Sequence, residues 1–326
     1  MPDQSFVVTG GAGFIGSNLV AALNARGHTD IVVVDTLNHP EKEHNLADAV
    51  YREFVTKQAF RERFLAGRHP LVDTVFHLGA CSSTTEQNAA YLEDNNVLYT
   101  RQLCEWCLAH DIRFVYASSA ATYGDGALGY VDDHTLIPSL EPLNLYGRSK
   151  QSFDLWALQS GAVDRIAGLK YFNVYGPREG HKGDMRSVVN KAYRQILDTG
   201  GLQLFRSHHP DYRDGEQLRD FVYVRDAVAV TLFFHDHPDQ SGIFNCGTGE
   251  ARSWLDLGRA VFAAMDREPD ITFIDMPSSI RDKYQYYTRA DVAKLRATGY
   301  NAPFTSIEAG VDDYVRNHLA PTMDSR

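Results

Sequence analysis

The chain has 326 residues and a formal net charge of −10, with 44% hydrophobic and 23% charged residues. These values are typical of a globular enzyme of about two domains, and the negative charge argues against nucleic acid or an anionic membrane surface as the main partner. No segment reaches the ~18 apolar residues of a membrane span, and the N-terminal segment lacks the features of a signal peptide. We therefore expect a cytoplasmic protein.

The four cysteines do not follow the pattern of a metal site. Cys104 and Cys107 form a C-x-x-C inside a segment with helical periodicity, while Cys81 and Cys246 stand alone in the sequence. No second Cys/His pair follows at zinc spacing. We expect buried structural thiols and no metal.

The first strand and the turn after it have the pattern of a dinucleotide site. Ser5–Thr9 is a short apolar, β-branched run, and Gly10, Gly13 and Gly16 follow it where a helix begins. Glycines at this spacing permit a tight turn and a close approach of the backbone to a pyrophosphate, which the helix N-terminus faces. A second apolar run ends at Asp35, where an acid is expected to contact the adenosine ribose. The pattern predicts a nicotinamide dinucleotide site.

The same segment gives conflicting indications about which dinucleotide binds. Asp35 favours the 2′-hydroxyl of NAD and repels the 2′-phosphate of NADP. Lys42 and Lys57 lie downstream, where a basic side chain can reach that phosphate. The residues by themselves leave both cofactors open.

Strand and helix patterns alternate as far as residue 172, which predicts an α/β fold with a doubly wound parallel (Rossmann) sheet. We expect further strands at residues 30–35, 74–78, 113–117 and 166–172, and helices at 17–26, 88–110 and 146–160. Ser118 and Ser119 follow the fourth strand, at the edge where such folds bind ligands. His77, at the end of the third, is interpreted as a core histidine.

Tyr146 and Lys150 open one of these helices at positions i and i+4, so both side chains lie on one face. A phenol is a poor base at neutral pH, but a neighbouring ammonium favours the phenolate and lowers the phenol pKa. The pair is predicted to move a proton on or off a hydroxyl. The alternative is a surface tyrosine packed on a lysine stem.

The alternation breaks after residue 172. Residues 173–183 are rich in turns, and helical patterns follow at 187–199, 224–234, 253–265, 290–298 and 306–319, with strands at 202–205 and 271–274. Residues 242–249 have the pattern of a strand and a turn, and we expect this strand to rejoin the sheet. We predict a smaller α/β substrate domain, about 173–220 and 250–320, interleaved with a cofactor domain of 1–172 and about 221–249.

These features resemble the extended short-chain dehydrogenase/reductase superfamily over the whole chain. The resemblance rests on the glycine-rich turn, Ser119 at the end of the fourth strand, and Tyr146 with Lys150 on the next helix. It implies that Tyr146 is the acid/base, that Lys150 also holds the nicotinamide ribose, and that Ser119 binds the reacting oxygen. The choice of Ser119 over Ser118 rests on the resemblance alone.

Longer runs are similar to those of the ADP-L-glycero-D-manno-heptose 6-epimerase family. These are residues 76–85, 117–124, 171–183 and 219–224, of which 171–183 is the most specific. The resemblance implies epimerisation of ADP-D-glycero-β-D-manno-heptose at C6, by transient oxidation and re-reduction, for the lipopolysaccharide core. It also implies one tightly bound NADP per subunit and a homo-oligomer, commonly a pentamer.

The resemblance also implies binding residues. The cofactor would contact Gly10, Gly13, Phe14, Ile15, Gly16, Asp35, Thr36, Lys42, Lys57, Leu78, Gly79, Ala80, Cys81, Ser82, Asn95, Lys150, Val174 and Lys182. The substrate would contact Ser119, Asn173, Asp184, Lys191, Phe205, Arg206, Ser207, His208, Arg219 and Tyr284. Lys182 would be a second acid/base on the opposite side of the sugar, with a diphosphate anchor as its alternative role.

The chain departs from the family pattern at three positions. Thr36 stands where relatives often have Asn beside the 2′-phosphate, Leu78 replaces an acid, and Lys191 replaces a His. The loop 206–218 is also longer than usual. These departures weaken the inference of NADP and the substrate contacts in that loop.

Three other functions remain as alternatives. A UDP-sugar 4-epimerase shares Ser119, Tyr146 and Lys150, but the run around Lys182 argues against it. A 4,6-dehydratase needs an acid pair where this chain has Ala120 and Ala121. A non-catalytic NADP-binding sensor would typically lack the Tyr or the Lys.

Overall fold

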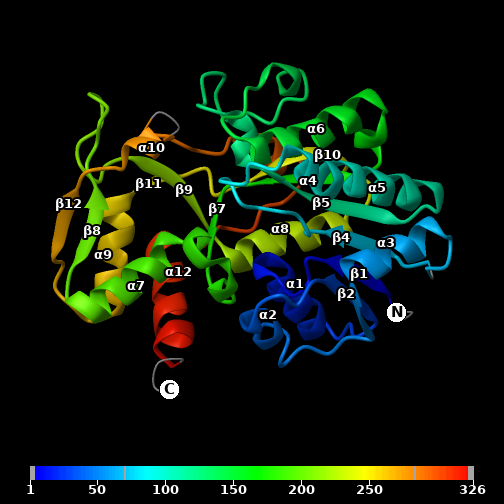
Figure 1. Ribbon diagram of the computed structural model, residues 1–326, viewed down its shortest axis with the longest axis horizontal. Coiled ribbons are helices and arrows are strands. Elements are labelled where there is room, and N and C mark those ends of the chain that lie inside the picture. The colour runs from blue at the N-terminus through cyan, green and yellow to red at the C-terminus, as the bar shows by residue number, and fades with distance from the viewer. Residues whose placement is uncertain (1–3, 70, 282–283, 322–326) are drawn as a thin grey trace.

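The computed structural model describes residues 4–69, 71–281 and 284–321 (Figure 1). Within these ranges seven strands form one parallel sheet in the order β10-β6-β5-β4-β1-β2-β3. They are β1 (Phe6–Thr9), β2 (Ile31–Asp35), β3 (Glu53–Thr56), β4 (Thr74–His77), β5 (Arg113–Ser119), β6 (Ala167–Tyr171) and β10 (Gly242–Cys246). Strands β1, β2 and β4 are buried along their whole length, as in parallel sheets covered on both faces. The predicted doubly wound sheet is confirmed.

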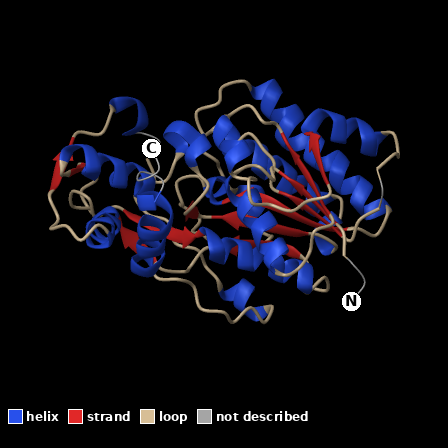
Figure 2. Ribbon diagram, turned by 90° about the horizontal axis from the view of Figure 1, so that it is seen from below, coloured by secondary structure: helices blue, strands red, loops and turns tan. Residues whose placement is uncertain are grey.

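Helices cover both faces of this sheet (Figure 2). On one face α1 (Phe14–Ala25) packs beside α8 (Val224–Asp236). The other face is covered by α3 (Lys57–Leu65), α5 (Tyr99–Ala109) and α6 (Leu145–Gln159). The strand order reverses between β1 and β4, so their carboxyl ends open a crevice where doubly wound folds bind ligands.

Two segments differ from the expected pattern. The predicted helix 88–110 is α4 (Ala89–Leu92), a π-helical stretch η1 (Glu93–Leu98) and α5 in succession. Strand β3 and helix α3 were not predicted, because Val55 is the one fully buried residue in β3 and the strand has no apolar run. The expected return of residues 242–249 to the sheet is confirmed, because β10 pairs with β6.

A smaller α/β region lies at the left of Figure 1. In the described part of the chain it holds a sheet β11-β9-β7 and a parallel pair β12-β8. Its elements are β7 (Asn173–Tyr175), α7 (Val188–Thr199), β8 (Leu202–Phe205), β9 (Leu218–Tyr223), β11 (Ala251–Ser253), α9 (Trp254–Ala264), β12 (Ile271–Ile274) and α12 (Ile307–Tyr314). A separate cluster of buried residues, including Val189, Ile196 and Val261, forms its core.

The two regions interleave as expected. The chain leaves the smaller region after β9, runs through α8 and β10 in the large sheet, and returns at β11. The residue boundaries predicted for the two domains stay a prediction.

Short elements complete the fold. They are α2 (Pro40–His44), η2 (Ala120–Tyr123), η3 (Ile137–Ser139), η4 (Ala162–Asp164), η5 (Gly180–Met185), α10 (Ser278–Arg281), α11 (Ala293–Ala297) and η6 (Val315–Leu319). Among the described residues, no helix combines the length and apolarity needed to cross a bilayer.

Candidate active site

A cavity of about 1010 Å³ opens at the carboxyl edge of the large sheet. Phe221, Trp254 and Leu257 of the smaller region line its far wall. Every residue predicted to be catalytic or to bind the cofactor lines it as well: Gly10, Gly13, Phe14, Ile15, Gly16, Asp35, Thr36, Lys42, Lys57, Leu78, Gly79, Ala80, Cys81, Ser82, Asn95, Ser119, Tyr146, Lys150, Val174 and Lys182. The fold therefore brings both predicted sets into one place.

The glycine-rich turn is closed so tightly that side chains would not fit. A Cβ on Gly10, whose φ is +68°, would lie 2.7 Å from Gly79 N, and one on Gly16 would lie 2.1 Å from Gly10 O. Gly13 caps α1 without a side-chain hydrogen bond, and α1, which is described throughout, has no acid in its first turn. The N–H groups of that turn and the helix dipole therefore suit a pyrophosphate, and the residues present fit a dinucleotide.

The carboxylate of Asp35, at the end of β2, contacts three donors of the chain. It accepts hydrogen bonds from Ala12 N at 2.9 Å and Thr36 N at 2.7 Å. Lys42, from α2, forms an ion pair with its Oδ1 at 2.8 Å. The negative charge at the end of β2 is thus compensated from within the chain.

Two asparagines of the π-helical stretch shape the adjoining wall. Lys57 Nζ donates to Asn95 Oδ1 at 2.6 Å, and Asn95 Nδ2 donates to Asn96 Oδ1 at 2.8 Å. Asn96 also holds the backbone of Cys81, accepting from its N and donating to its O, both at 2.9 Å. The turn after β4 is fixed by these bonds, and the sequence did not indicate this role for Asn96.

The two serines at the end of β5 have different surroundings. Ser118 is buried, and its hydroxyl donates to Asp154 Oδ2 at 2.7 Å. Ser119 forms a side-chain hydrogen bond with Tyr146, and its Oγ accepts from Ala121 N at 3.1 Å. This geometry favours Ser119 as the hydroxyl that serves the site, as the resemblance implied.

Asn144 begins α6 by accepting from Gly147 N at 2.8 Å, which places Tyr146 in the first turn. Burial raises the pKa of Tyr146, and the hydrogen bond with Ser119 offsets part of that rise. Burial lowers the pKa of Lys150 to about 8, and its ammonium donates to Ala117 O at 2.9 Å. The prediction that Lys150 lowers the pKa of Tyr146 is therefore wrong for the chain alone, because burial dominates and the ammonium binds a carbonyl.

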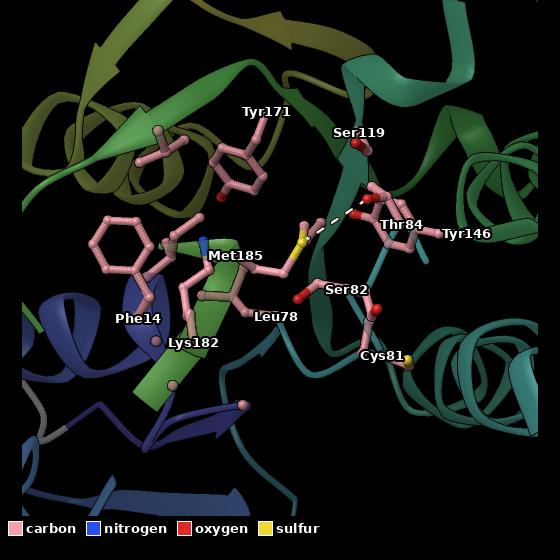
Figure 3. A pocket seen from close by; sticks show the side chains of 18 of the residues that line it. Phe14, Leu78, Cys81, Ser82, Thr84, Ser119, Tyr146, Tyr171, Lys182 and Met185 are labelled. Carbon is pink, nitrogen blue, oxygen red and sulfur yellow. Dashed lines mark hydrogen bonds between the residues drawn. The ribbon is translucent and has the colours of Figure 1, made fainter. Parts of the chain in front are cut away.

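Lys182 faces this pair across the cavity. Figure 3 shows Lys182 and Phe14 on one side, and Ser119 and Tyr146 on the other. The Lys182 Nζ lies 5.1 Å from the centre of the Phe14 ring. Burial lowers the pKa of Lys182, and the charge of Glu179 opposes this effect.

The segment that carries Lys182 is anchored to both regions. On the cofactor side, Asn18 Nδ2 donates to Pro177 O at 3.0 Å and Asn45 Nδ2 donates to Arg178 O at 3.0 Å. On the substrate side, the fully buried Glu179 accepts from Ser187 N at 2.6 Å and from Tyr314 Oη at 3.0 Å. These contacts fix the position of η5, and hence of Lys182.

The predicted substrate residues divide into two groups. Ser119 and Asn173 line the cavity. The others lie outside its lining: Asp184, Lys191, Phe205, Arg206, Ser207, His208, Arg219 and Tyr284. Their role in binding stays a prediction.

Two residues of the second group, Arg219 and Tyr284, contact Trp254 of the cavity wall. Trp254 Nε1 donates to Tyr284 Oη at 2.8 Å. The Arg219 guanidinium is buried, lies 5.0 Å from the Tyr284 ring and 5.7 Å from the Trp254 ring, and donates to Leu218 O at 2.8 Å. Burial lowers the pKa of Arg219. Arg219 therefore stands directly behind the cavity wall formed by Trp254.

Several lining residues were not indicated by the sequence. Met185 lies between the two sides in Figure 3, and Thr84 Oγ1 donates to its Sδ at 3.9 Å. His181 lies beside Asn45, 3.4 Å from its Nδ2, and burial followed by the charge of Lys42 lowers the pKa of His181 to about 4. His181 stands next to Lys182 in the run of residues 171–183, which is the one signal that pointed to it.

Polar residues outside the cavity include His77 and two of the cysteines. His77 is buried between Thr9 Oγ1 at 2.7 Å and Thr100 Oγ1 at 2.9 Å, which confirms the core interpretation. Cys104 and Cys107 are buried free thiols whose pKa burial raises. No cluster of metal-binding side chains occurs in the described ranges.

Comparison with known proteins places these features in a family. The model of the NAD dependent epimerase/dehydratase family matches residues 6–247. The ADP-L-glycero-D-manno-heptose-6-epimerase of Nitratidesulfovibrio vulgaris strain Hildenborough is 55% identical over 316 residues, 97% of this chain and 98% of the relative. That of Fusobacterium nucleatum is 44% identical, covering 96% of this chain and 98% of the relative.

Solved structures share the whole fold. The crystal structure of ADP-L-glycero-D-manno-heptose-6-epimerase from Helicobacter pylori superposes with a TM-score of 0.79 at 27% identity, covering 97% of this chain and 96% of that one. UDP-glucose 4-epimerase from Thermotoga maritima, solved with UDP-glucose, gives a TM-score of 0.76 at 26% identity, covering 98% of this chain and 100% of that one. The complex of the Thermus thermophilus UDP-glucose 4-epimerase contains NAD.

Proposed function

Because the chain belongs to the NAD dependent epimerase/dehydratase family, we propose that it inverts C6 of ADP-D-glycero-β-D-manno-heptose to form the L-glycero epimer. The observation that carries the proposal is a cavity with Ser119 and Tyr146 on one side and Lys182 on the other, in a chain that is 44% to 55% identical to heptose 6-epimerases over nearly its full length. The product would serve the lipopolysaccharide core.

The reaction has three stages. C6 is oxidised to a ketone, the ketone turns to present its other face, and the ketone is then reduced. A nicotinamide cofactor, when bound, would accept a hydride from C6 and return it to C6. Tyr146 and Lys182 hold or take the proton of the C6 hydroxyl, giving a 6-ketone and restoring the hydroxyl afterwards. Ser119 donates a hydrogen bond to the reacting oxygen, and Lys150 binds the nicotinamide ribose.

Two proton-transfer groups on opposite sides suit an inversion. The C6 oxygen must lie on different sides of the cavity in the two poses, because the ketone is reduced on the face opposite to the one that was oxidised. We assign Tyr146, on one side of the cavity, to one pose and Lys182, on the other side, to the second pose. Burial lowers the pKa of Lys182 from its usual value, which favours its use as a proton-transfer group.

For the cofactor we propose NADP, bound once per subunit. The ion pair with Lys42 compensates the charge of Asp35, which removes the repulsion that Asp35 would exert on a 2′-phosphate. Lys57 also lines the cavity. NAD remains the alternative.

The cofactor preference is testable at Lys42. We expect Lys42→Met to weaken NADP binding by about 10- to 100-fold, because a charge-assisted contact is lost and Asp35 is left uncompensated. NAD binding should change by much less. Titration of cofactor-free protein with each dinucleotide measures both affinities, and an equal loss for NAD and NADP would contradict the proposal.

The substrate nucleotide is proposed to extend past Trp254 towards the second group of predicted residues. Arg219 offers guanidinium donors there for a diphosphate. We also propose a cytoplasmic homo-oligomer, a pentamer by resemblance to the family.

The direct test is NMR of ADP-D-glycero-heptose incubated with the purified protein and no added reductant. The L-glycero epimer should appear, while UDP-glucose under the same conditions should stay unchanged. When the purified protein is denatured, it should release NADP. Absence of the epimer, or conversion of UDP-glucose to UDP-galactose instead, would overturn the proposed substrate.

A further inference from the structure

A buried ion pair lies beneath the proposed catalytic residues. Asp154 of α6 and Lys170 of β6 are both fully buried, and Lys170 Nζ lies 2.7 Å from Asp154 Oδ2. Replacing a buried ion pair by apolar side chains of similar volume is often neutral or stabilising, because both charges must be desolvated. Fold stability alone therefore does not account for this pair.

The pair joins four elements that meet at the site. Asp154 accepts from Tyr116 Oη at 2.9 Å and from Ser118 Oγ at 2.7 Å, which ties α6 to the end of β5. Lys170 Nζ also donates to Thr122 Oγ1 at 2.7 Å, which ties β6 to η2. A carboxylate that accepts from three donors is held at a fixed position.

The position of Asp154 relates it directly to the proposed acid/base groups. It lies one turn after Lys150 and two turns after Tyr146, on the same face of α6. Its partner Ser118 immediately precedes Ser119 on β5. The hydrogen bond between Ser119 and Tyr146 therefore spans the same two elements that Asp154 locks together.

The charges around Lys150 give Asp154 an electrostatic role as well. Burial lowers the pKa of Lys150 to about 8, and the charge of Asp154 raises it, followed by that of Cys81. In the described part of the chain, Lys150 also interacts with His77 of β4, and Lys170 of β6 contacts Asp154 itself. Asp154 is the carboxylate of this group.

We propose that Asp154, held by Lys170, is a positioning residue: it aligns the end of β5 with α6 and supplies the negative charge that keeps Lys150 an ammonium. The inference rests on the proposed function in that Tyr146 and Lys150 are the groups that serve proton transfer. Asp154 itself does not line the cavity, so it acts through Lys150 and Ser118.

The test uses holoenzyme of the wild type and of three variants. Asp154→Asn removes the charge at constant shape. The double variant Asp154→Leu/Lys170→Met removes both charges and keeps the site filled, so we expect it to fold even if a lone Lys170 destabilises the first variant. Asp132→Asn is the matched control, because Asp132 is also buried, accepts from Asn245 N at 2.7 Å and does not line the cavity.

Two readouts separate positioning from mere stability. The chain has eight lysines, so ¹³Cε-lysine NMR can follow the titration of Lys150, assigned by its loss in Lys150→Met. We expect the apparent pKa of Lys150 to fall by about one unit in Asp154→Asn, and to fall in the double variant as well. In both, kcat should fall by roughly 30-fold or more with KM within about threefold, and the alkaline limb of kcat should move to lower pH. Asp132→Asn should leave all three unchanged.

A folded double variant with wild-type kcat, alkaline limb and Lys150 titration would overturn the inference, whatever its melting temperature. Two single variants add a check: Lys170→Met should lower kcat, because Asp154 loses the partner that holds it, and Lys170→Arg should keep most of the wild-type kcat. If the wild type does not epimerise the heptose, the proposed function fails, while the Lys150 titration still decides whether Asp154 acts on Lys150.

Discussion

Burial moves the pKa values of Tyr146 and Lys150 in opposite directions, upward for the phenol and downward to about 8 for the ammonium. The resting pair is thus a neutral phenol beside an amine that is close to losing its proton at mildly alkaline pH. The spacing of the two residues predicted their common face, but not these shifts, because desolvation depends on what covers α6 in three dimensions. Ser119, which opposes the rise in the pKa of Tyr146, is supplied by a different element.

At this scale, Tyr146→Phe and Lys182→Met test the two proton-transfer groups. Each should lower kcat by about 10² to 10⁴, because general acid–base catalysis is worth that much. Each should retain bound cofactor, since neither substitution alters the glycine turn or Asp35. The rate of heptose epimerisation by NMR and the cofactor absorbance of the purified protein measure the two effects. Normal turnover by Lys182→Met would rule out the two-sided scheme.

At the scale of elements, the site depends on two turns that are held in place by distant residues. Asn96 fixes the turn after β4, and Glu179 fixes η5. Neither residue could be recognised from the sequence, because each acts through partners far along the chain: Cys81 for Asn96, and Ser187 and Tyr314 for Glu179. The glycine turn was predictable residue by residue, since its requirement is local: a backbone without Cβ atoms.

Glu179→Gln tests the anchor of η5. The variant loses a buried charge-assisted acceptor, so the free energy of unfolding should fall by about 1–3 kcal/mol. It also removes the charge that raises the pKa of Lys182, so kcat should fall by roughly tenfold or more. Urea unfolding and the epimerisation rate measure these effects.

The control for that experiment is Glu268→Gln, at an exposed glutamate of the smaller region. It should leave both quantities unchanged. Wild-type kcat in a folded Glu179→Gln protein would show that η5 keeps Lys182 in place without this carboxylate.

At the scale of the whole molecule, the cavity lies between two hydrophobic clusters, one around the large sheet and one in the smaller region. The sheet followed from apolar runs in the sequence, and its return strand β10 was expected. Strand β3 was not, because an edge strand needs no fully apolar run. The long loop after β8 shows the same limit: Arg206 there faces Asp214 and Asp275 at 3.7 and 3.8 Å, contacts between segments that no local pattern encodes.

The core histidine His77 makes global stability depend on pH. Burial, followed by the charge of Lys150, lowers the folded pKa of His77 to about 3, against about 6.5 in an unfolded chain. Between these values the unfolded chain binds a proton that the folded protein does not, so stability falls as the pH drops through this window. The contribution is up to about 1.4 kcal/mol per pH unit.

We therefore expect the free energy of unfolding, measured in urea, to fall less steeply from pH 6.5 to pH 4 in His77→Gln than in the wild type. The exposed His110→Gln should keep the wild-type slope. Identical slopes for all three proteins would contradict the assignment of this effect to His77.

In the proposed reaction, one hydride leaves C6, stays bound to the enzyme and returns to the other face of C6. This transfer is tested most directly with ADP-D-glycero-heptose carrying deuterium at C6, incubated in ordinary water without added reductant. We predict that the L-glycero epimer keeps the deuterium at C6, because the hydride does not exchange with solvent. Formation of the epimer with hydrogen at C6 would contradict transient oxidation by a bound nicotinamide, and would point to removal of a C6 proton instead.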